Sequence, residues 1–230
     1  MPTQINGFTT ANTADVDGLV FRAQKGTQRP TDYSTLGHYS LGVASGVMAA
    51  GLAANSEIFQ FMGTTSSISV LVVQKVVISA AVSTTLFAAG VPLQFDMVKA
   101  TPWSVQGTGG TGITLGATCK ERTSTASSAI PAGNIRIATT TGLGAGTKTL
   151  EGNSLAALAA PGPITASNVR QVINPGTLLY QPNASDGHCP LVFANNGSAA
   201  EGFVIRATAV PATGTWTFAV QVYWAEVAAY

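Results

Sequence analysis

The chain has 230 residues, only 9% of them charged, and a formal net charge of +1. Ordinary soluble proteins carry about 25% charged residues, so part of this surface is expected to be buried against other chains. The small net charge argues against the strongly basic face that nucleic-acid binding requires. Two cysteines, Cys119 and Cys189, allow one disulfide at most, and the sequence leaves open whether they pair.

The first 35 residues are expected to form an extended N-terminal arm, followed by a single β-sandwich domain at 36–230. Residues 1–20 are polar, small and glycine-containing, which is typical of a flexible segment. They lack the basic and apolar regions of a signal peptide. The segment "FRAQKGTQRP" at 21–30 carries three positive charges and no negative one. The candidate interaction residues of the arm are Phe21, Arg22, Lys25 and Arg29.

From residue 38 onward, short β-rich runs alternate with turns rich in Gly and Pro, which is typical of a sandwich or barrel. We therefore predict an all-β fold, an antiparallel, jelly-roll-like β-sandwich with at most short helices. The expected strands are 38–48, 57–63, 68–79, 91–100, 112–118, 134–140, 169–173, 177–181, 190–194, 202–209 and 215–227. The expected turns are 107–112, 141–146, 174–176, 195–197 and 211–214. One short helix is expected within 151–162, a stretch that is rich in Ala and Leu, and it should stop before Pro161-Gly162.

The most apolar stretch, residues 66–95, is predicted to be two strands joined by a turn and not a membrane span. Lys75 lies in its middle, and Gly90-Val91-Pro92 interrupts it. A lysine at the centre of a membrane helix is costly.

The final apolar stretch, "TGTWTFAVQVYWAEV" at 213–227, has a period of two, since Trp216, Phe218, Val220, Val222 and Trp224 occupy every second position. This periodicity predicts a strand with one large apolar face. We expect Trp216 and Trp224 to be buried in the core. The opposite face carries smaller side chains and suits contact with either water or another chain.

No catalytic or metal-binding motif is evident. The only histidines are His38 and His188, and the "DGHC" at 186–189 lacks the four ligands that a zinc site needs. Ser45 does not lie in a nucleophile elbow, and "GTGGTG" at 107–112 lacks the Lys-Ser/Thr of a phosphate-binding loop. The acidic residues are scattered along the chain, although a carboxylate pair assembled by folding stays open. We expect no catalytic residue, metal or cofactor, and the chain is not expected to be an enzyme.

Four segments carry a resemblance to a known group of proteins, namely 36–61, "GTGGTGITL" at 107–115, "IRIATTTGLGAGTKTLEGNSL" at 135–155 and 201–227. Together they resemble a widespread group of uncharacterised virion structural proteins of tailed bacteriophages. The resemblance covers most of the chain from about Val20. It is a likeness of pattern and carries over no active-site residue. It implies a β-rich particle component that is present in many copies.

The resemblance and the composition lead to one functional expectation, a capsid decoration or cement subunit that stabilises the shell through protein–protein contacts. The alternative is a tail, fibre or baseplate subunit that contacts the host surface through loop tips such as "NASDGH" at 183–188. The expected partners are further copies of the chain, as a trimer or another small cyclic oligomer, and the major capsid protein or other virion subunits. No nucleic acid or membrane is expected as a partner, and the location would be the virion, assembled in the host cytoplasm.

Overall fold

The computed structural model describes residues 5–6, 13–16, 24–25, 35–64, 70–87, 91–116, 118–121, 126–160, 171–182, 190–194 and 199–228. The chain divides into two compact units, Met1–Tyr33 and Ser34–Tyr230. In the first unit, β1 (Ile5–Asn6), β2 (Thr13–Val16) and β3 (Gln24–Lys25) form an antiparallel sheet in the order β1-β2-β3.

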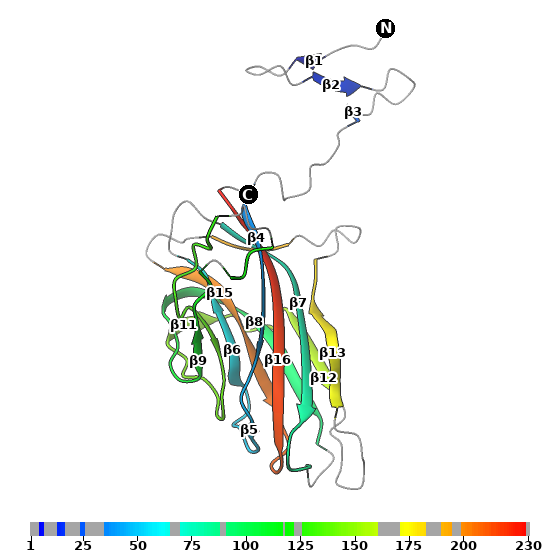
Figure 1. Ribbon diagram of the computed structural model, residues 1–230, viewed down its shortest axis with the longest axis vertical. Helices are drawn as coiled ribbons and strands as arrows, with labels where there is room; N and C mark the ends of the chain where they lie inside the picture. Colours follow the sequence, from blue (N-terminus) through cyan, green and yellow to red (C-terminus); the bar gives the residue numbers. More distant parts are fainter. Residues whose placement is uncertain are drawn as a thin grey trace. The chain divides into compact units, whose positions relative to one another are not determined.

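The second unit is built from two antiparallel sheets (Figure 1). The first, which we call the β16 sheet, has six strands. They are β13 (Gln171–Tyr180), β7 (Val70–Val82), β16 (Thr215–Val227) and β4 (Thr35–Ala44) in that order, with β14 (Leu191–Phe193) paired to β7 and β5 (Met48–Ala49) paired to β16.

The second sheet, the β15 sheet, has seven strands. They are β11 (Thr147–Leu150), β8 (Leu93–Val105), β15 (Ala200–Ala209), β6 (Ser56–Met62), β10 (Ile135–Ile137) and β9 (Thr111–Ile113) in that order, with β12 (Ala156–Ala160) paired to β8. The consecutive strands β6, β7 and β8 alternate between the sheets, and β15 inserts between β6 and β8. The predicted fold class, an all-β antiparallel sandwich, is confirmed.

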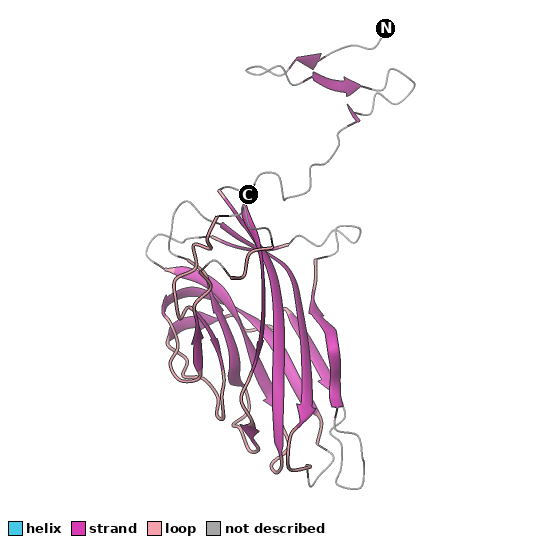
Figure 2. Cartoon of the chain, in the orientation of Figure 1, coloured by secondary structure: helices cyan, strands magenta, loops and turns pink. Residues whose placement is uncertain are grey.

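The described residues contain no helix, as Figure 2 shows. Accordingly, no helix in this part of the chain has the length and hydropathy needed to cross a membrane.

The inner faces of the two sheets meet in one aromatic core. The ring of Phe61 on β6 lies edge-on to Trp224 on β16, with their centroids 5.4 Å apart. The Phe95 ring on β8 lies 5.7 Å from Trp216 and 5.3 Å from Phe218. These contacts join strands of opposite sheets, so the core is the sandwich interior.

The period-two prediction for the C-terminal strand is confirmed. Both Trp216 and Trp224 are fully buried. Phe218, Val220 and Val222 share their face, and all three are also buried. The alternation of burial ends after Trp224, because Ala225 and Val227 on the other face are also buried, in a separate apolar cluster with Val72.

The helix expected at 151–162 is wrong within the described residues. Residues 156–160 form β12, which pairs with β8 from Ala156 opposite Met97 to Ala160 opposite Leu93. Ala and Leu favour a helix only weakly, and tertiary context overrides such preferences. Pairing with β8 gives the backbone N–H and C=O groups of this segment hydrogen bonds to a neighbouring strand, in place of the bonds that a helix would form.

The turn expected at 174–176 is wrong as well, because the two strands predicted around it are one strand, β13. The pairing of β13 with β7 shifts register between Ile173 and Thr177, so the Asn-Pro-Gly sequence is accommodated as a bulge. Gly176 takes a φ of 78°, which explains the glycine. The strand expected at 112–118 is shorter than predicted and ends at Ile113.

Candidate functional site

Four arrangements have the burial or chemistry of a functional site. Three are polar clusters, and the fourth is the outer face of the β16 sheet.

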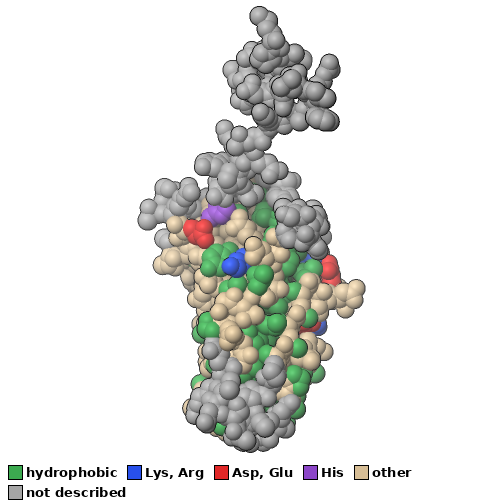
Figure 3. Space-filling view, turned by 90° about the vertical axis from the view of Figure 1, so that its right-hand side faces the viewer, with side chains coloured by type: hydrophobic (Ala, Val, Ile, Leu, Met, Phe, Trp, Pro, Cys, Tyr) green, Lys and Arg blue, Asp and Glu red, His purple; other side chains and the backbone are tan. Residues whose placement is uncertain are grey.

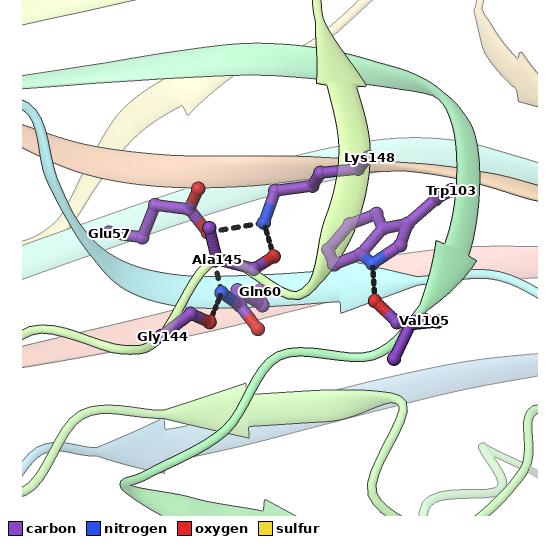
Figure 4. Close-up of polar contacts among 7 residues, drawn as sticks. All are labelled: Glu57, Gln60, Trp103, Val105, Gly144, Ala145 and Lys148. Atoms are coloured by element: carbon purple, nitrogen blue, oxygen red, sulfur yellow. Dashed lines mark hydrogen bonds and ion pairs between the residues drawn. The ribbon is translucent and has the colours of Figure 1, made fainter.

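The first cluster surrounds Lys148 on β11 (Figure 4). Its Nζ lies 2.8 Å from Oε2 of Glu57 on β6, and the two side chains are 2% and 8% exposed. The ammonium also donates to the Ala145 carbonyl and lies over the Trp103 ring, 4.6 Å from its centroid. Gln60 Nε2 donates to the same Glu57 oxygen at 2.5 Å. The cluster therefore ties β11 and the 144–148 turn to β6.

The second cluster crosses three strands of the β15 sheet. In the register of the sheet, Arg206 on β15 stands opposite Asp96 on β8 and Glu57 on β6. The Arg206 Nε donates to Asp96 Oδ1 at 3.0 Å, Nη2 donates to Oδ2, and Ser154 Oγ donates to Oδ2 at 2.6 Å. The hydrogen bonds from Arg206 to Asp96 raise the pKa of the guanidinium. This is a fork of the kind that fixes geometry.

The third cluster lies around Glu226, which is 1% exposed near the end of β16. Its carboxylate accepts hydrogen bonds from Ser128 Oγ at 2.5 Å, from the Ala129 backbone N–H at 2.8 Å and from Trp224 Nε1 at 3.3 Å. The segment 126–130 is thereby anchored to β16.

Beside this third cluster lies Tyr39 on β4, which is fully buried and stacks on Trp224 with centroids 5.4 Å apart. Its hydroxyl donates to the Ala126 carbonyl at 2.9 Å. Burial first, and then the charges of Glu226 and Cys119, raise the pKa of Tyr39 to about 12. Burial also raises the pKa of the Cys119 thiol.

The raised pKa of Tyr39 predicts a loss of stability in strong alkali. Below about pH 10, tyrosine is neutral in both the folded and the unfolded chain. Between about pH 10 and the folded-state pKa of about 12, the unfolded chain releases the proton while the folded chain keeps it, so the free energy of unfolding falls. We expect Tyr39→Phe to flatten this fall, measured by denaturant unfolding from pH 9 to pH 12. Parallel profiles for the wild type and the variant would contradict the assignment.

These clusters are buried structural contacts between segments of the domain, and none of them has the open, solvent-accessible arrangement of an active site. Lys148, Glu57 and Asp96 are almost completely buried, and each side chain is engaged by an opposite charge. Among the described residues, no group of three or more His, Cys, Asp or Glu side chains is arranged to hold a metal ion. The expectation that the chain is not an enzyme stays a prediction.

The fourth arrangement is the outer face of the β16 sheet, which we call the smooth face. It comprises a shallow trough of about 370 Å³ and the adjoining Leu178. Small side chains form much of the trough, among them Gly42 and Ala44 on β4, Ser79 on β7 and Ala219 on β16, and none of its lining residues is charged. Figure 3 views the molecule from the side where β7 and β13 lie in Figure 1, and it shows mostly green and tan atoms with few charged groups.

The sequence-predicted arm residues are only partly described. Lys25 lies in β3, where its Cα is the partner of Asp15 in β2. The other three, Phe21, Arg22 and Arg29, lie outside the described residues, as do the 183–188 loop and the "DGHC" segment.

Of the two cysteines, Cys119 is buried and forms no disulfide with any of the described residues. Cys189 lies outside the described residues, so the pairing question stays open.

The polar clusters were missed by the sequence reading, which took the acidic residues as scattered. Asp96 and Arg206 are 110 residues apart, and Glu57 and Lys148 are 91 apart. No local spacing signals such pairs. The outer face of β16, in contrast, was visible as the smaller side of the period-two pattern.

Comparison with known proteins assigns no family. No family model matches the sequence, and no curated protein matches it. Among solved structures, the chain is similar to a chain of the full particle of Israeli acute paralysis virus, heated to 63 degree, at 11% identity and a TM-score of 0.21. The match covers 98% of this chain and 79% of that chain. At this identity and TM-score the likeness carries no functional argument.

Proposed function

We propose that this chain is a structural subunit of a virus particle, and specifically a decoration or cement subunit on the capsid of a tailed bacteriophage. The observation that carries the proposal is the smooth face, a sheet surface whose trough is lined by no charged residue. The three polar clusters support it, because their hydrogen bonds and ion pairs fasten one segment of the domain to another. The resemblance of segments 36–61 and 201–227 to phage virion proteins supports the particle assignment.

Such a subunit acts by making contacts with neighbouring subunits of the shell. Burying apolar surface contributes about 25 cal/mol per Å², so a modest contact area repeated over many copies sums to a large stabilisation of a shell. A low content of charged residues suits this role, because burying an unpaired charge in an interface is costly.

The direct test is the position of the chain in purified particles. Electron cryomicroscopy of intact virions is expected to show it on the outer surface of the shell. Density on the tail or baseplate would instead favour the alternative, a subunit that contacts the host. Absence from purified particles would overturn the virion assignment altogether.

The basic segment predicts that attachment depends on salt. We expect Arg22, Lys25 and Arg29 to face acidic surface on a neighbouring subunit, so raising the salt concentration should weaken attachment by screening. Reversing the three charges to Glu should weaken it at low salt and remove most of its salt dependence. Co-sedimentation of the protein with stripped particles measures both effects. Attachment that is equally tight in the reversed protein would exclude the arm as a contact.

A further inference from the structure

We infer that the smooth face is the contact between two copies of this chain, which pack face to face about a two-fold axis. The inference gives the proposed assembly role a specific surface, and it rests on that role only for the particle-binding readout below.

The size of the face fits a stable contact. The four main strands of the β16 sheet are 10 to 13 residues long. At about 3.3 Å per residue and about 4.8 Å between strands, their whole outer side spans roughly 600–800 Å². One end of it is already buried at Val72, Ala225 and Val227, which leaves roughly 500–700 Å² open. Standard protein–protein interfaces bury about 600–1,000 Å² on each partner. One copy covering the open part of the face of another therefore reaches the lower end of the area that a specific dimer needs.

The charge of the face permits contact with an identical surface. A face of one sign would repel its own copy, but none of the residues that line the trough is charged. The nearest cation on the outward side of β7 is Lys75, whose Nζ lies over the Tyr223 ring, 5.9 Å from its centroid. The face also lacks the charge pattern that would select a different partner by complementarity.

The relief of the face is complementary to itself. Leu178 on β13 stands opposite Val77 in the register of the sheet, so both side chains lie on the same side. Val77 lines the trough, whereas Leu178 is 50% exposed and projects beside it. In a two-fold contact, if one residue of the first copy touches a second residue of the other copy, the same pair also touches with the copies exchanged. The Leu178 side chain of each copy would then enter the trough of the other.

Gly42 provides a clean probe of this contact. It lies near the C-terminal end of β4 without a positive φ, and a Cβ built there meets nothing within 4 Å. The monomer can therefore take a larger side chain at this position, whereas a second sheet packed on the face cannot. A matched control exists at Gly152, which is exposed beside β12 of the other sheet and likewise meets nothing within 4 Å.

The test compares Gly42→Arg with Gly152→Arg in the full-length protein. Light scattering coupled to size exclusion is expected to give the mass of a dimer for the wild type and for Gly152→Arg at micromolar concentration. Gly42→Arg is expected to weaken self-association at least about tenfold, because it buries an unpaired charge. Leu178→Asp should do the same from the opposite side of the contact. Circular dichroism and thermal unfolding check that each variant keeps its fold.

Three results would overturn the inference. The first is a wild-type protein that is monomeric at micromolar concentration. The second is an oligomer that survives both Gly42→Arg and Leu178→Asp. The third is a trimer, the state that the phage resemblance implies, because an isologous face produces dimers.

A monomer whose Gly42→Arg variant alone loses particle binding would assign the face to a different virion subunit. A dimer that Gly42→Arg dissociates, in a chain absent from particles, would keep this inference and remove the proposed function.

Discussion

Replacing Trp224 with alanine is expected to lower the free energy of unfolding by roughly 3–5 kcal/mol. The side chain is fully buried, stacks on Tyr39 and lies edge-on to Phe61, so its removal opens a cavity between the two sheets. It also removes the Nε1 donor from the buried Glu226 carboxylate. Urea unfolding at one fixed protein concentration measures the effect, since self-association would shift the apparent stability.

A pair of milder variants separates the contribution of side-chain packing from that of the hydrogen bond to Glu226. Trp216 is also fully buried, but its Nε1 has no hydrogen-bond partner among the described residues. Trp216→Phe therefore removes a buried, unsatisfied donor, whereas Trp224→Phe leaves Glu226 with one donor fewer. We expect Trp224→Phe to be the more destabilising of the two. Equal losses would show that the Glu226 contact contributes nothing, and a freely quenched Trp224 would refute its burial.

Replacing Lys148 with methionine is expected to destabilise the fold by about 3–5 kcal/mol, because it leaves the Glu57 carboxylate buried without its ammonium partner. The Lys148 and Glu57 side chains are 2% and 8% exposed, so water cannot solvate the Glu57 carboxylate that is left unpaired. The matched control is Lys99→Met. Lys99 pairs with Glu151 at 3.5 Å, but the two side chains are 27% and 45% exposed, and such pairs contribute about 0–1 kcal/mol.

A double variant tests the mechanism of this loss. If an unpaired buried charge is the cause, replacing Glu57 with methionine as well should restore part of the stability, because removing both charges of a buried pair is often neutral. A double variant that is less stable than Lys148→Met would instead show that the hydrogen bond between Glu57 and Gln60 matters more than the ion pair.

Much of the fold class follows from local pattern. The alternation of Trp216, Phe218, Val220, Val222 and Trp224 identifies both the strand and its buried face, because a period of two places these side chains on one side of any strand. The low charge content is likewise a property of the composition alone, and the burial of surface against other chains that it predicts stays a prediction. Neither property depends on which strands become neighbours.

Pairing between distant strands decided the remainder. The 156–160 segment is a strand because β8 lies beside it, although Ala and Leu locally favour a helix. The Asn-Pro-Gly sequence at 174–176 became a bulge, since β7 holds the residues on both sides of it. Arg206 pairs with Asp96 because β15 and β8 are neighbours in the sheet. Lys148 reaches Glu57 because the loop before β11 lies against β6, where the Leu143 N–H donates to the Glu57 carbonyl. Contacts over about a hundred residues depend on strand order and register, which no short stretch of sequence encodes.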